Sequence, residues 1–309
     1  MLATAQGECI GYGLGGPGNP TSAGPERAAE GVLTAVARAL ALADAGLSDV
    51  TVIIAAMAGQ RAGSDAGDWL LRRLEAEGFA GELAFESDLL AIYFSGSAED
   101  RGYAVVAGTG ACAVRVRGGR VEATGDGLGW LLGDRGGGFW IGHRVARAAL
   151  RDLDGAGPST TLTAAVLDHV GIATDAARGS GRRRDVERLI EALYAVRPVE
   201  LSRLAPLAFA ADDPVAAGIL RRAGEHLART LAGVLDGPGP LVVGGSVLFR
   251  AGPVREAFVD HLGGAADGLE LRPVVDGAIG AGQLALRAAG VSVTAPVLER
   301  LHDSLSRFR

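Results

Sequence analysis

The sequence predicts an α/β protein of two lobes, each built on a mixed β-sheet flanked by helices. Over the first hundred residues, apolar strand-like runs alternate with amphipathic helical patterns, which is typical of α/β layers. Three strand-like segments then follow one another between residues 103 and 124, and this change marks a second lobe. The 309 residues, 48% of them hydrophobic, are enough for two domains of ordinary size.

The first lobe has two strand–helix repeats. Residues 25–45 predict an amphipathic helix, because apolar residues recur at helical spacing between a proline at the start and a glycine at the end. Residues 50–56 form a continuous apolar run, the pattern of a strand buried on both faces, and residues 65–77 are helical again. A strand at 82–85 and a helix at 88–94 repeat the order.

The second lobe opens with the three strands of a β-meander, joined by short glycine-containing links. The next elements are expected in this order: a glycine-rich loop, a helix at 139–153, mostly helical residues at 159–236, a strand ending at Gly244, a helix from about Pro253, a strand at 269–271 and a closing helix. We therefore assign residues 1–101, completed by residues 290–309, to the first lobe. Residues 102–289 form the second lobe.

The composition excludes several kinds of site. All 30 basic residues are arginine, so a phosphate loop that needs a lysine is excluded, and phosphate must be held by backbone, hydroxyl, metal ion or arginine. The net charge of −6, with arginines spread among acids, predicts no nucleic-acid partner. Two distant cysteines, Cys9 and Cys112, and five scattered histidines predict no metal site made by the protein. Without a signal peptide or membrane-spanning run, we expect a cytoplasmic protein with no membrane partner.

Two groups of small residues directly follow apolar strands. They are Gly108, Thr109 and Gly110 in the meander, and Gly244, Gly245 and Ser246 before the helix expected near Pro253. Glycines let a ligand approach the backbone closely, and exposed N–H groups bind phosphate oxygens, with a helix N-terminus adding partial positive charge at the second group. Either group alone is also the pattern of a plain turn. Both in one chain indicate a nucleotide site.

Asp88 and Asp134 are candidate functional carboxylates. Asp88 stands between a strand and a helix, at the carboxyl end of the strand, where α/β sheets bind ligands. It is either a general base or the N-cap of the helix. Asp134 lies in the central glycine-rich loop, where it is either a turn residue or an acceptor for substrate hydroxyl groups. Asn19, before a proline, has the composition of an ordinary turn.

Six segments in one order resemble the BadF/BadG/BcrA/BcrD-type ATPase family, over nearly the whole chain. They are "GGPGNPTSAG", "FESDLLAIYF", "VVAGTGACAVRV", "GLGWLLGDRGGGFWIG", "VVGGSVLF" and "DGAIGAGQLAL". The family includes N-acetylglucosamine kinases of the actin/hexokinase/heat-shock ATPase superfamily. The resemblance implies a two-lobed, ribonuclease H-like fold, ATP and Mg²⁺ as cofactors, a homodimer, and phosphoryl transfer to a sugar hydroxyl, usually the 6-hydroxyl.

The resemblance also implies roles for individual residues. Asp88 matches the catalytic base, which accepts the hydroxyl proton during phosphoryl transfer. The positions that bind or line the sugar are matched by Asn19, Ala111, Cys112, Gly127, Leu128, Gly129 and Asp134. The second phosphate loop is matched by Gly108, Thr109 and Gly110, and the adenosine loop by Gly244, Gly245 and Ser246.

Three features depart from the family. Leu128 stands where relatives often carry Trp, and Arg135 where they often carry Glu, so the identity of the sugar stays open. The family's first strand and its Asp-Gly-Gly-Gly-Thr-like phosphate loop have no counterpart, because "MLATAQGECIGYG" resembles the second strand, a turn and the third strand. We expect a gap in the first sheet. Either the start of the sequence is misplaced by about one strand and loop, or phosphoryl transfer is impaired.

The leading functional hypothesis is ATP-dependent phosphorylation of N-acetylglucosamine or glucosamine to the 6-phosphate. The alternatives are a non-catalytic sugar or nucleotide sensor, an ATPase that drives a partner protein, and a paralogue that binds sugar without catalysis. Two distant cysteines argue against the family's iron–sulfur activators, and the missing cysteine cluster against related zinc-bearing sugar kinases.

Overall fold

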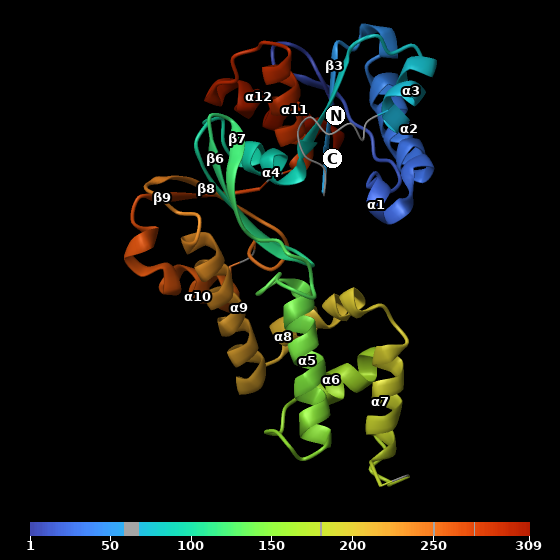
Figure 1. The fold of residues 1–309 in the computed structure, drawn as a ribbon, viewed down its shortest axis with the longest axis vertical. Helices are drawn as coiled ribbons and strands as arrows, with labels where there is room; N and C mark the ends of the chain where they lie inside the picture. Colours follow the sequence, from blue (N-terminus) through green and yellow to red (C-terminus); the bar gives the residue numbers. More distant parts are fainter. Residues whose placement is uncertain (59–67, 180, 250, 275) are drawn as a thin grey trace. The chain divides into compact units, whose positions relative to one another are not determined.

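The structure, a computed structural model, describes residues 1–58, 68–179, 181–249, 251–274 and 276–309, which form two compact units (Figure 1). Unit 1 comprises Met1–Ala104, Val116–Val121 and Leu271–Arg309. Unit 2 comprises Val105–Arg115 and Glu122–Glu270. The predicted alternation of strands and helices, followed by a meander, is present.

Unit 1 contains short strands and the helices that cover them. Its elements are β1 (Leu2–Ala3), β2 (Cys9–Gly11), α1 (Pro20–Ala23), α2 (Pro25–Leu42), a 3-10 turn (Leu47–Asp49), β3 (Val52–Met57), α3 (Asp68–Ala76), β4 (Glu82–Ser87), α4 (Asp88–Gly96), α11 (Gly277–Ala288), α12 (Ala295–Leu305) and a 3-10 turn (Ser306–Phe308). The first residues of the helix predicted at 65–77 lie outside the described residues.

The sheet of unit 1 is interrupted. β1 pairs antiparallel with β2, and β3 pairs parallel with β4, with Val52 opposite Glu82 and Met57 opposite Ser87. Among the described residues no strand joins the two pairs. The predicted gap in the first sheet is therefore present.

Two hydrophobic clusters hold unit 1 together. One packs α2 and α3 on the β3–β4 pair, around Leu70, Leu74 and Phe85. The other packs α11 and α12 on the β1–β2 pair, around Ile279 and Leu301. Residues 271–289, which the sequence analysis assigned to the second lobe, lie in unit 1, where α11 packs on α4 and β3.

A five-stranded sheet has the order β7-β6-β5-β8-β9, and most of its residues belong to unit 2, while residues 102–104, 116–117, 120–121 and 271–273 belong to unit 1. The strands are β5 (Gly102–Ala107), β6 (Ala111–Arg117), β7 (Arg120–Asp126), β8 (Gly239–Gly244) and β9 (Leu269–Pro273). The first three are the predicted meander. β5 and β8, at the centre, are almost completely buried, as their continuous apolar sequences predict.

The rest of unit 2 is helical, as predicted. Its elements are α5 (Gly138–Leu153), α6 (Leu162–His169), α7 (Arg184–Tyr194), a 3-10 helix (Pro198–Leu204), α8 (Ala205–Ala210), α9 (Pro214–Ala232), α10 (Pro253–Leu262) and a 3-10 turn (Gly263–Ala266). α5 packs against α6, α8 and α9, and α9 against α10. No helix within the described ranges is both long and apolar enough to cross a membrane.

Gly280 gives a test of the α4–α11 contact. A Cβ atom at Gly280 would overlap the Ala91 carbonyl oxygen and lie 2.9 Å from the Ser95 nitrogen. We predict that Gly280→Ala lowers the free energy of unfolding by about 1–3 kcal/mol, the usual cost of overpacking. Chemical denaturation followed by circular dichroism measures this.

The matched control is Gly218→Ala, a helical glycine in α9 where an added Cβ meets only the end of the Arg222 side chain, at 3.8 Å. This variant should gain up to about 1 kcal/mol from helix propensity. Equal stability of the two variants would contradict the proposed close contact at Gly280.

Candidate functional site

Asp88 is the first residue of α4, directly after β4. The Ser87 hydroxyl oxygen accepts a hydrogen bond from the Leu89 N–H at 3.2 Å and caps the helix. An Asp88 carboxylate oxygen also accepts from the Leu89 N–H, at 3.0 Å. The capping role considered for Asp88 thus belongs to Ser87. Burial raises the pKa of Asp88, and backbone hydrogen bonds from Leu89 and from Asp88 itself partly oppose this.

Asn19 and Asp88 lie at the same end of the β3–β4 pair. The Asn19 side-chain nitrogen donates to the Ala58 carbonyl oxygen at 3.3 Å, and Ala58 directly follows the last residue of β3. That last residue, Met57, is opposite Ser87 in the parallel register. The carboxyl ends of β3 and β4 therefore present an amide and a half-buried carboxylate on one edge, the usual location of ligands in α/β sheets.

In unit 2, the Gly-Thr-Gly loop between β5 and β6 is held by the start of α5. The loop closes on itself, because the Gly108 N–H donates to the Gly110 carbonyl at 3.0 Å. The Gly108 carbonyl accepts from the Gly138 N–H at 2.7 Å, and the Thr109 carbonyl from the Phe139 N–H at 2.9 Å. The first amides of α5 are thus used to fix the loop, while the Thr109 side chain is exposed.

Two further glycine-rich segments pack against this loop. A Cβ atom at Gly137 would lie 2.7 Å from the Gly110 carbonyl carbon. A Cβ at Gly245, whose φ is +85°, would overlap the Ala107 carbonyl oxygen, which also accepts from the Val247 N–H at 2.9 Å. Backbone therefore packs on backbone at both contacts, a spacing that only glycine allows. We call residues 108–110, 136–138 and 244–246 the glycine cluster.

The sequence analysis found two of these three segments. It missed the structural part played by residues 136–138, although three consecutive glycines before a helix were a signal. The helix expected from about Pro253 is present as α10, but a turn follows β8 and separates Ser246 from the start of this helix, so the expected helix N-terminus does not directly follow the second glycine group. The helix N-terminus that meets the cluster is that of α5, at the other loop.

Asp134 lies beside the Gly-Thr-Gly loop and is positioned by a second carboxylate, Asp126. A Cβ atom at Gly110 would overlap the Asp134 carboxylate. The Asp126 carboxylate accepts the backbone N–H groups of Asp134 at 2.7 Å and of Arg135 at 3.0 Å. Both acids have left-handed backbone conformations, φ +57° at Asp126 and +55° at Asp134, which aspartate tolerates better than most residues. Sequence reasoning missed Asp126.

The electrostatics of Asp134 follow from this position. Burial raises the pKa of Asp134, and a hydrogen bond from the Ala111 backbone N–H is the main opposing effect. The nearby Asp126 charge raises the pKa further. Asp134 therefore holds its charge less readily than an exposed carboxylate, and a hydroxyl group that donates to it would be well placed to satisfy it.

The remaining predicted sugar-lining residues lie around the start of β6. Ala111 and Cys112 are buried, and the Gly127 N–H donates to the Ala111 carbonyl at 3.1 Å. A Cβ atom at Gly127 would lie 3.1 Å from that of Cys112. The structure thus brings Ala111, Cys112 and Gly127 together with Asp134. Leu128, 65% exposed, projects to the surface, and Gly129 is next to it in the loop.

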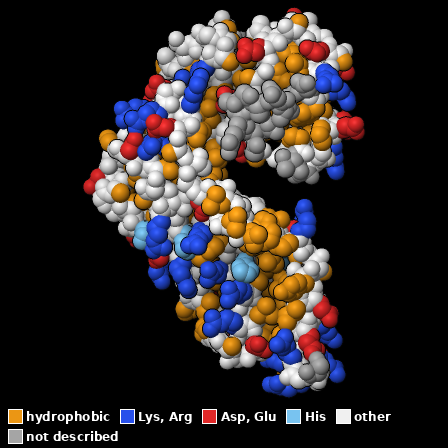
Figure 2. All heavy atoms as spheres, viewed as in Figure 1, with side chains coloured by type: hydrophobic (Ala, Val, Ile, Leu, Met, Phe, Trp, Pro, Cys, Tyr) orange, Lys and Arg blue, Asp and Glu red, His pale blue; other side chains and the backbone are white. Residues whose placement is uncertain are grey.

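Arginine side chains gather on the α5 and α9 part of unit 2, with histidines among them (Figure 2). The Arg144 guanidinium lies 4.7 Å from the centre of the Trp140 ring, and the His226 ring lies 5.1 Å from it. Burial and then the charges of Arg229 and Arg135 lower the pKa of His226. Arg229 of α9 is far in the sequence from Arg135 and Arg144, and the packing of α5 on α9 brings these three arginines close to His226. Because the chain has no lysine, these arginine side chains are the cationic groups that could bind an anion here.

Within the described part of the chain, no group of three or more His, Cys, Asp or Glu side chains could hold a metal ion. Mg²⁺ that accompanies a nucleotide is usually held by one or two carboxylates, waters and the phosphates. The carboxylates of unit 2 near the glycine cluster, Asp126 and Asp134, are of the right chemical type for such an ion.

The family model described as "BadF/BadG/BcrA/BcrD ATPase family" matches residues 1–285. The chain belongs to this ATPase family. The resemblance to this family that the sequence motifs indicated is therefore confirmed. The chain is 28% identical over 165 residues to the N-acetylmuramic acid/N-acetylglucosamine kinase of Clostridium acetobutylicum. That match covers 52% of this chain and 50% of the relative, so it spans about half the length of this curated protein.

Solved structures agree on the fold. A protein of Chromobacterium violaceum assigned as an N-acetylglucosamine kinase is 26% identical, with 90% of each chain covered and a TM-score of 0.64. A protein of Porphyromonas gingivalis with the same assignment is 19% identical, with 94% of this chain and 95% of that chain covered and a TM-score of 0.67. The fold is the predicted actin/hexokinase-like ATPase fold.

Asp126 gives a test of how Asp134 is positioned. We predict that Asp126→Ala speeds hydrogen exchange at the Asp134 and Arg135 amides by about 10- to 100-fold, because hydrogen bonds to a charged acceptor contribute about 1.5–3 kcal/mol. Exchange followed by NMR or mass spectrometry measures this. Asp168→Ala, at an exposed position of α6, is the control and should leave these amides unchanged. Equal exchange in both variants would show that Asp126 does not fix the loop.

Proposed function

We propose that the protein is an ATP-dependent kinase of an amino sugar, N-acetylglucosamine or glucosamine, with the 6-hydroxyl as the acceptor. The observation that carries this proposal is the half-buried Asp88 carboxylate at the carboxyl end of β4, in a chain that belongs to this ATPase family. The similarity over 90% of both chains to a protein assigned as an N-acetylglucosamine kinase supports the choice of substrate.

In unit 1, the proposed roles belong to Asp88 and Asn19. Asp88 accepts the proton of the sugar hydroxyl as the oxygen attacks, and its raised pKa makes it a stronger base than an exposed aspartate. The Asn19 amide, held by Ala58 at the same edge, donates to or accepts from sugar hydroxyls. Mg-ATP, when bound, supplies the phosphoryl group, and its Mg²⁺ ion neutralises charge on the phosphates.

In unit 2, we assign phosphate contacts to the Gly-Thr-Gly loop, where the exposed Thr109 hydroxyl is a donor, and adenosine contacts to Gly244, Gly245 and Ser246. Asp134 accepts hydrogen bonds from sugar hydroxyls. Sugar-lining positions are assigned to Ala111, Cys112, Gly127, Leu128 and Gly129. We infer a homodimer from the family resemblance, and the cytoplasmic location expected from the sequence stays a proposal.

A second candidate is a protein that binds sugar or nucleotide without catalysis. The interrupted sheet of unit 1 favours it, because no strand among the described residues pairs with the other side of β3 in the β3–β4 pair that carries Asp88. Greater mobility of this strand pair would move the Asp88 carboxylate away from the reacting hydroxyl. Small displacements of a catalytic group strongly reduce the reaction rate.

The experiment that separates the candidates is ADP release from Mg-ATP with N-acetylglucosamine, glucosamine, N-acetylmuramic acid or glucose. The kinase proposal expects sugar-dependent ADP release and a sugar 6-phosphate product. Heat of sugar binding in calorimetry, without sugar-dependent ADP release, would instead support the non-catalytic candidate.

Within the kinase proposal, we predict that Asp88→Asn lowers kcat by about 10²- to 10⁴-fold, the usual contribution of a general base. Its melting temperature should be equal or higher. Burial raises the folded-state pKa of Asp88, so its charged form costs stability above that pKa, and the neutral amide removes this cost. For the same reason, wild-type activity should fall as pH decreases through the raised pKa.

The control is Asp303→Asn, at an exposed position of α12, which should change neither kcat nor stability. Retention of wild-type kcat by Asp88→Asn would rule out Asp88 as the base.

A further inference from the structure

Arginines cover the surface of unit 2 where α5 packs against α9 (Figure 2). Arg144 and Arg147 come from α5, Arg222 and Arg229 from α9, and Arg135 from the loop before α5. Four of these side chains are exposed, and the fifth, Arg144, is half-buried. We call these five residues the arginine row.

The row follows the two helices along their length. The Trp140 ring of α5 meets the His226 ring of α9, with 5.1 Å between the ring centres. Arg144, one turn later in α5, lies near Arg222, one turn earlier in α9, so the helices run in opposite directions. Arg222 and Arg229 are two turns apart, about 10 Å along α9. The row therefore offers positive charge over an extended surface.

One carboxylate pairs with the row. Glu225 lies 3.6 Å from Arg229, and it also pairs with Arg221, outside the row, at 2.5 Å. No other member of the row forms an ion pair with a carboxylate within the described part of the chain. The row thus keeps a net positive charge, although the whole chain carries a net charge of −6.

The arginines of the row repel one another. Burial lowers the pKa of Arg144, and three positive charges lower it further, those of Arg147, Arg222 and Arg135. Like charges at such short range destabilise one another, and a bound anion would relieve this repulsion. An anion that contacted both helices would also stabilise the folded unit, because it binds only the folded state.

The extent of the row indicates which anion fits it. Guanidinium groups bind phosphate oxygens with paired, charge-assisted hydrogen bonds. One orthophosphate ion presents a single centre of charge, whereas the row offers guanidinium groups from three segments over about two helical turns. A short chain of phosphate groups matches both the length and the charge of the row.

Two larger occupants fit less well. A long polyanion such as a nucleic acid would extend beyond the row onto a chain that is negatively charged as a whole. A second copy of the chain, related by a twofold axis at this surface, would bring the row against itself, and like charges repel.

We propose that the arginine row binds a free oligophosphate anion, a short linear chain of phosphate groups, across α5 and α9. The site uses none of the residues assigned above to the sugar, the phosphates of ATP or adenosine. The inference therefore goes beyond the proposed kinase activity and stands apart from it.

Calorimetric titration of sodium tripolyphosphate into the full chain tests the site. At low ionic strength we expect a Kd of about 0.1 mM or tighter, and weaker binding as salt is added, because salt screens exposed charges. The variant Arg135→Gln/Arg147→Gln/Arg222→Gln removes three exposed charges of the row. It should bind tripolyphosphate at least about tenfold more weakly, since each guanidinium contact is charge-assisted.

The matched control is Arg182→Gln/Arg184→Gln/Arg188→Gln, which removes three exposed charges at and before the start of α7. This variant should bind tripolyphosphate as the wild type does. An NMR titration of the wild type gives a readout that needs no variant. Tripolyphosphate should shift the indole N–H signal of Trp140 and leave that of Trp69, in unit 1, unchanged.

Three further titrations identify the ligand and the place. Orthophosphate should bind at least about tenfold more weakly than tripolyphosphate, because it neutralises only part of the row. Hexaglutamate, and vesicles of phosphatidylcholine and phosphatidylserine in equal parts, should also bind more weakly. Gly137→Ala, which disturbs the glycine cluster, should leave tripolyphosphate binding unchanged. Failure of the kinase proposal therefore leaves this test intact.

Four outcomes would overturn the proposal. The first is no binding of tripolyphosphate, and the second is equal weakening in the row variant and the α7 control. The third is tighter binding of hexaglutamate or of the vesicles, which would indicate an acidic protein or a membrane surface as the partner. The fourth is loss of binding in Gly137→Ala but not in the row variant, which would place the anion at the glycine cluster.

Discussion

The contact between the start of α5 and the Gly-Thr-Gly loop determines the geometry of unit 2 around its candidate site. Two N–H groups that a helix normally leaves without a partner, those of Gly138 and Phe139, donate to the carbonyls of Gly108 and Thr109. Because helix and loop satisfy each other, both become fixed. The same approach requires glycine at 137, since a side chain there would meet the Gly110 backbone. From this contact follow the position of Asp134 beside Gly110 and the exposure of the Thr109 side chain.

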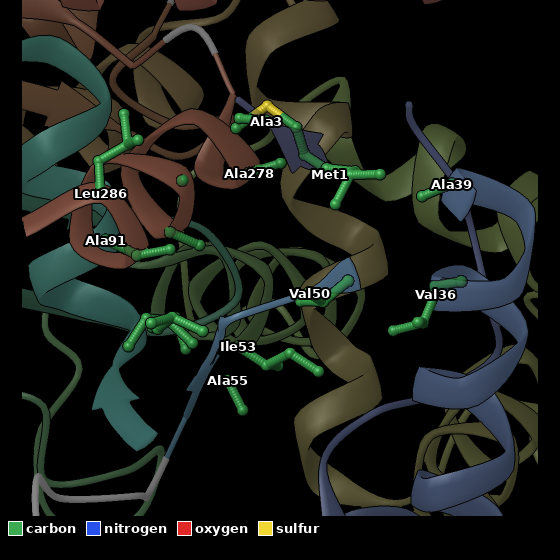
Figure 3. A pocket seen from close by; sticks show the side chains of 18 of the residues that line it. Met1, Ala3, Val36, Ala39, Val50, Ile53, Ala55, Ala91, Ala278 and Leu286 are labelled. Carbon is green, nitrogen blue, oxygen red and sulfur yellow. The ribbon is translucent and has the colours of Figure 1, made fainter. Parts of the chain in front are cut away.

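Unit 1 uses a different arrangement to present Asp88. Ser87 takes over helix capping, which leaves the neighbouring carboxylate half-buried at a strand end, where its charge is disfavoured. A carboxylate held in this way costs stability when it is charged, because burial disfavours the charged form. The same unit carries a cost elsewhere, since β3 has the apolar sequence of an interior strand but pairs only with β4 within the part of the chain that the structure describes. Residues of β3 and Asp88 line the same cavity of unit 1 (Figure 3).

Much of the fold and part of the candidate site could be predicted from the sequence, because the patterns that indicate them lie within short segments. Glycine pairs punctuate the meander, and the continuous apolar runs of β5 and β8 indicate central strands. The order of motifs indicated the family. The missed features depend on contacts between distant segments: Asp126 binds amides eight and nine residues away, and Gly137 matters only through Gly110. No local pattern reports such pairs. The helix expected from about Pro253 is present, but a turn separates it from β8, so it does not place its N-terminus directly after Ser246.

The central claim is that backbone packing within the glycine cluster builds a nucleotide site. Calorimetric titration of ATP into Gly137→Ala, the wild type and Gly218→Ala tests it most directly, because the first variant places a Cβ atom 2.7 Å from Gly110 and the last leaves the cluster untouched. We expect ATP affinity to fall at least about tenfold in Gly137→Ala, equivalent to about 1.4 kcal/mol, and to stay unchanged in Gly218→Ala. Wild-type affinity in Gly137→Ala would contradict the account.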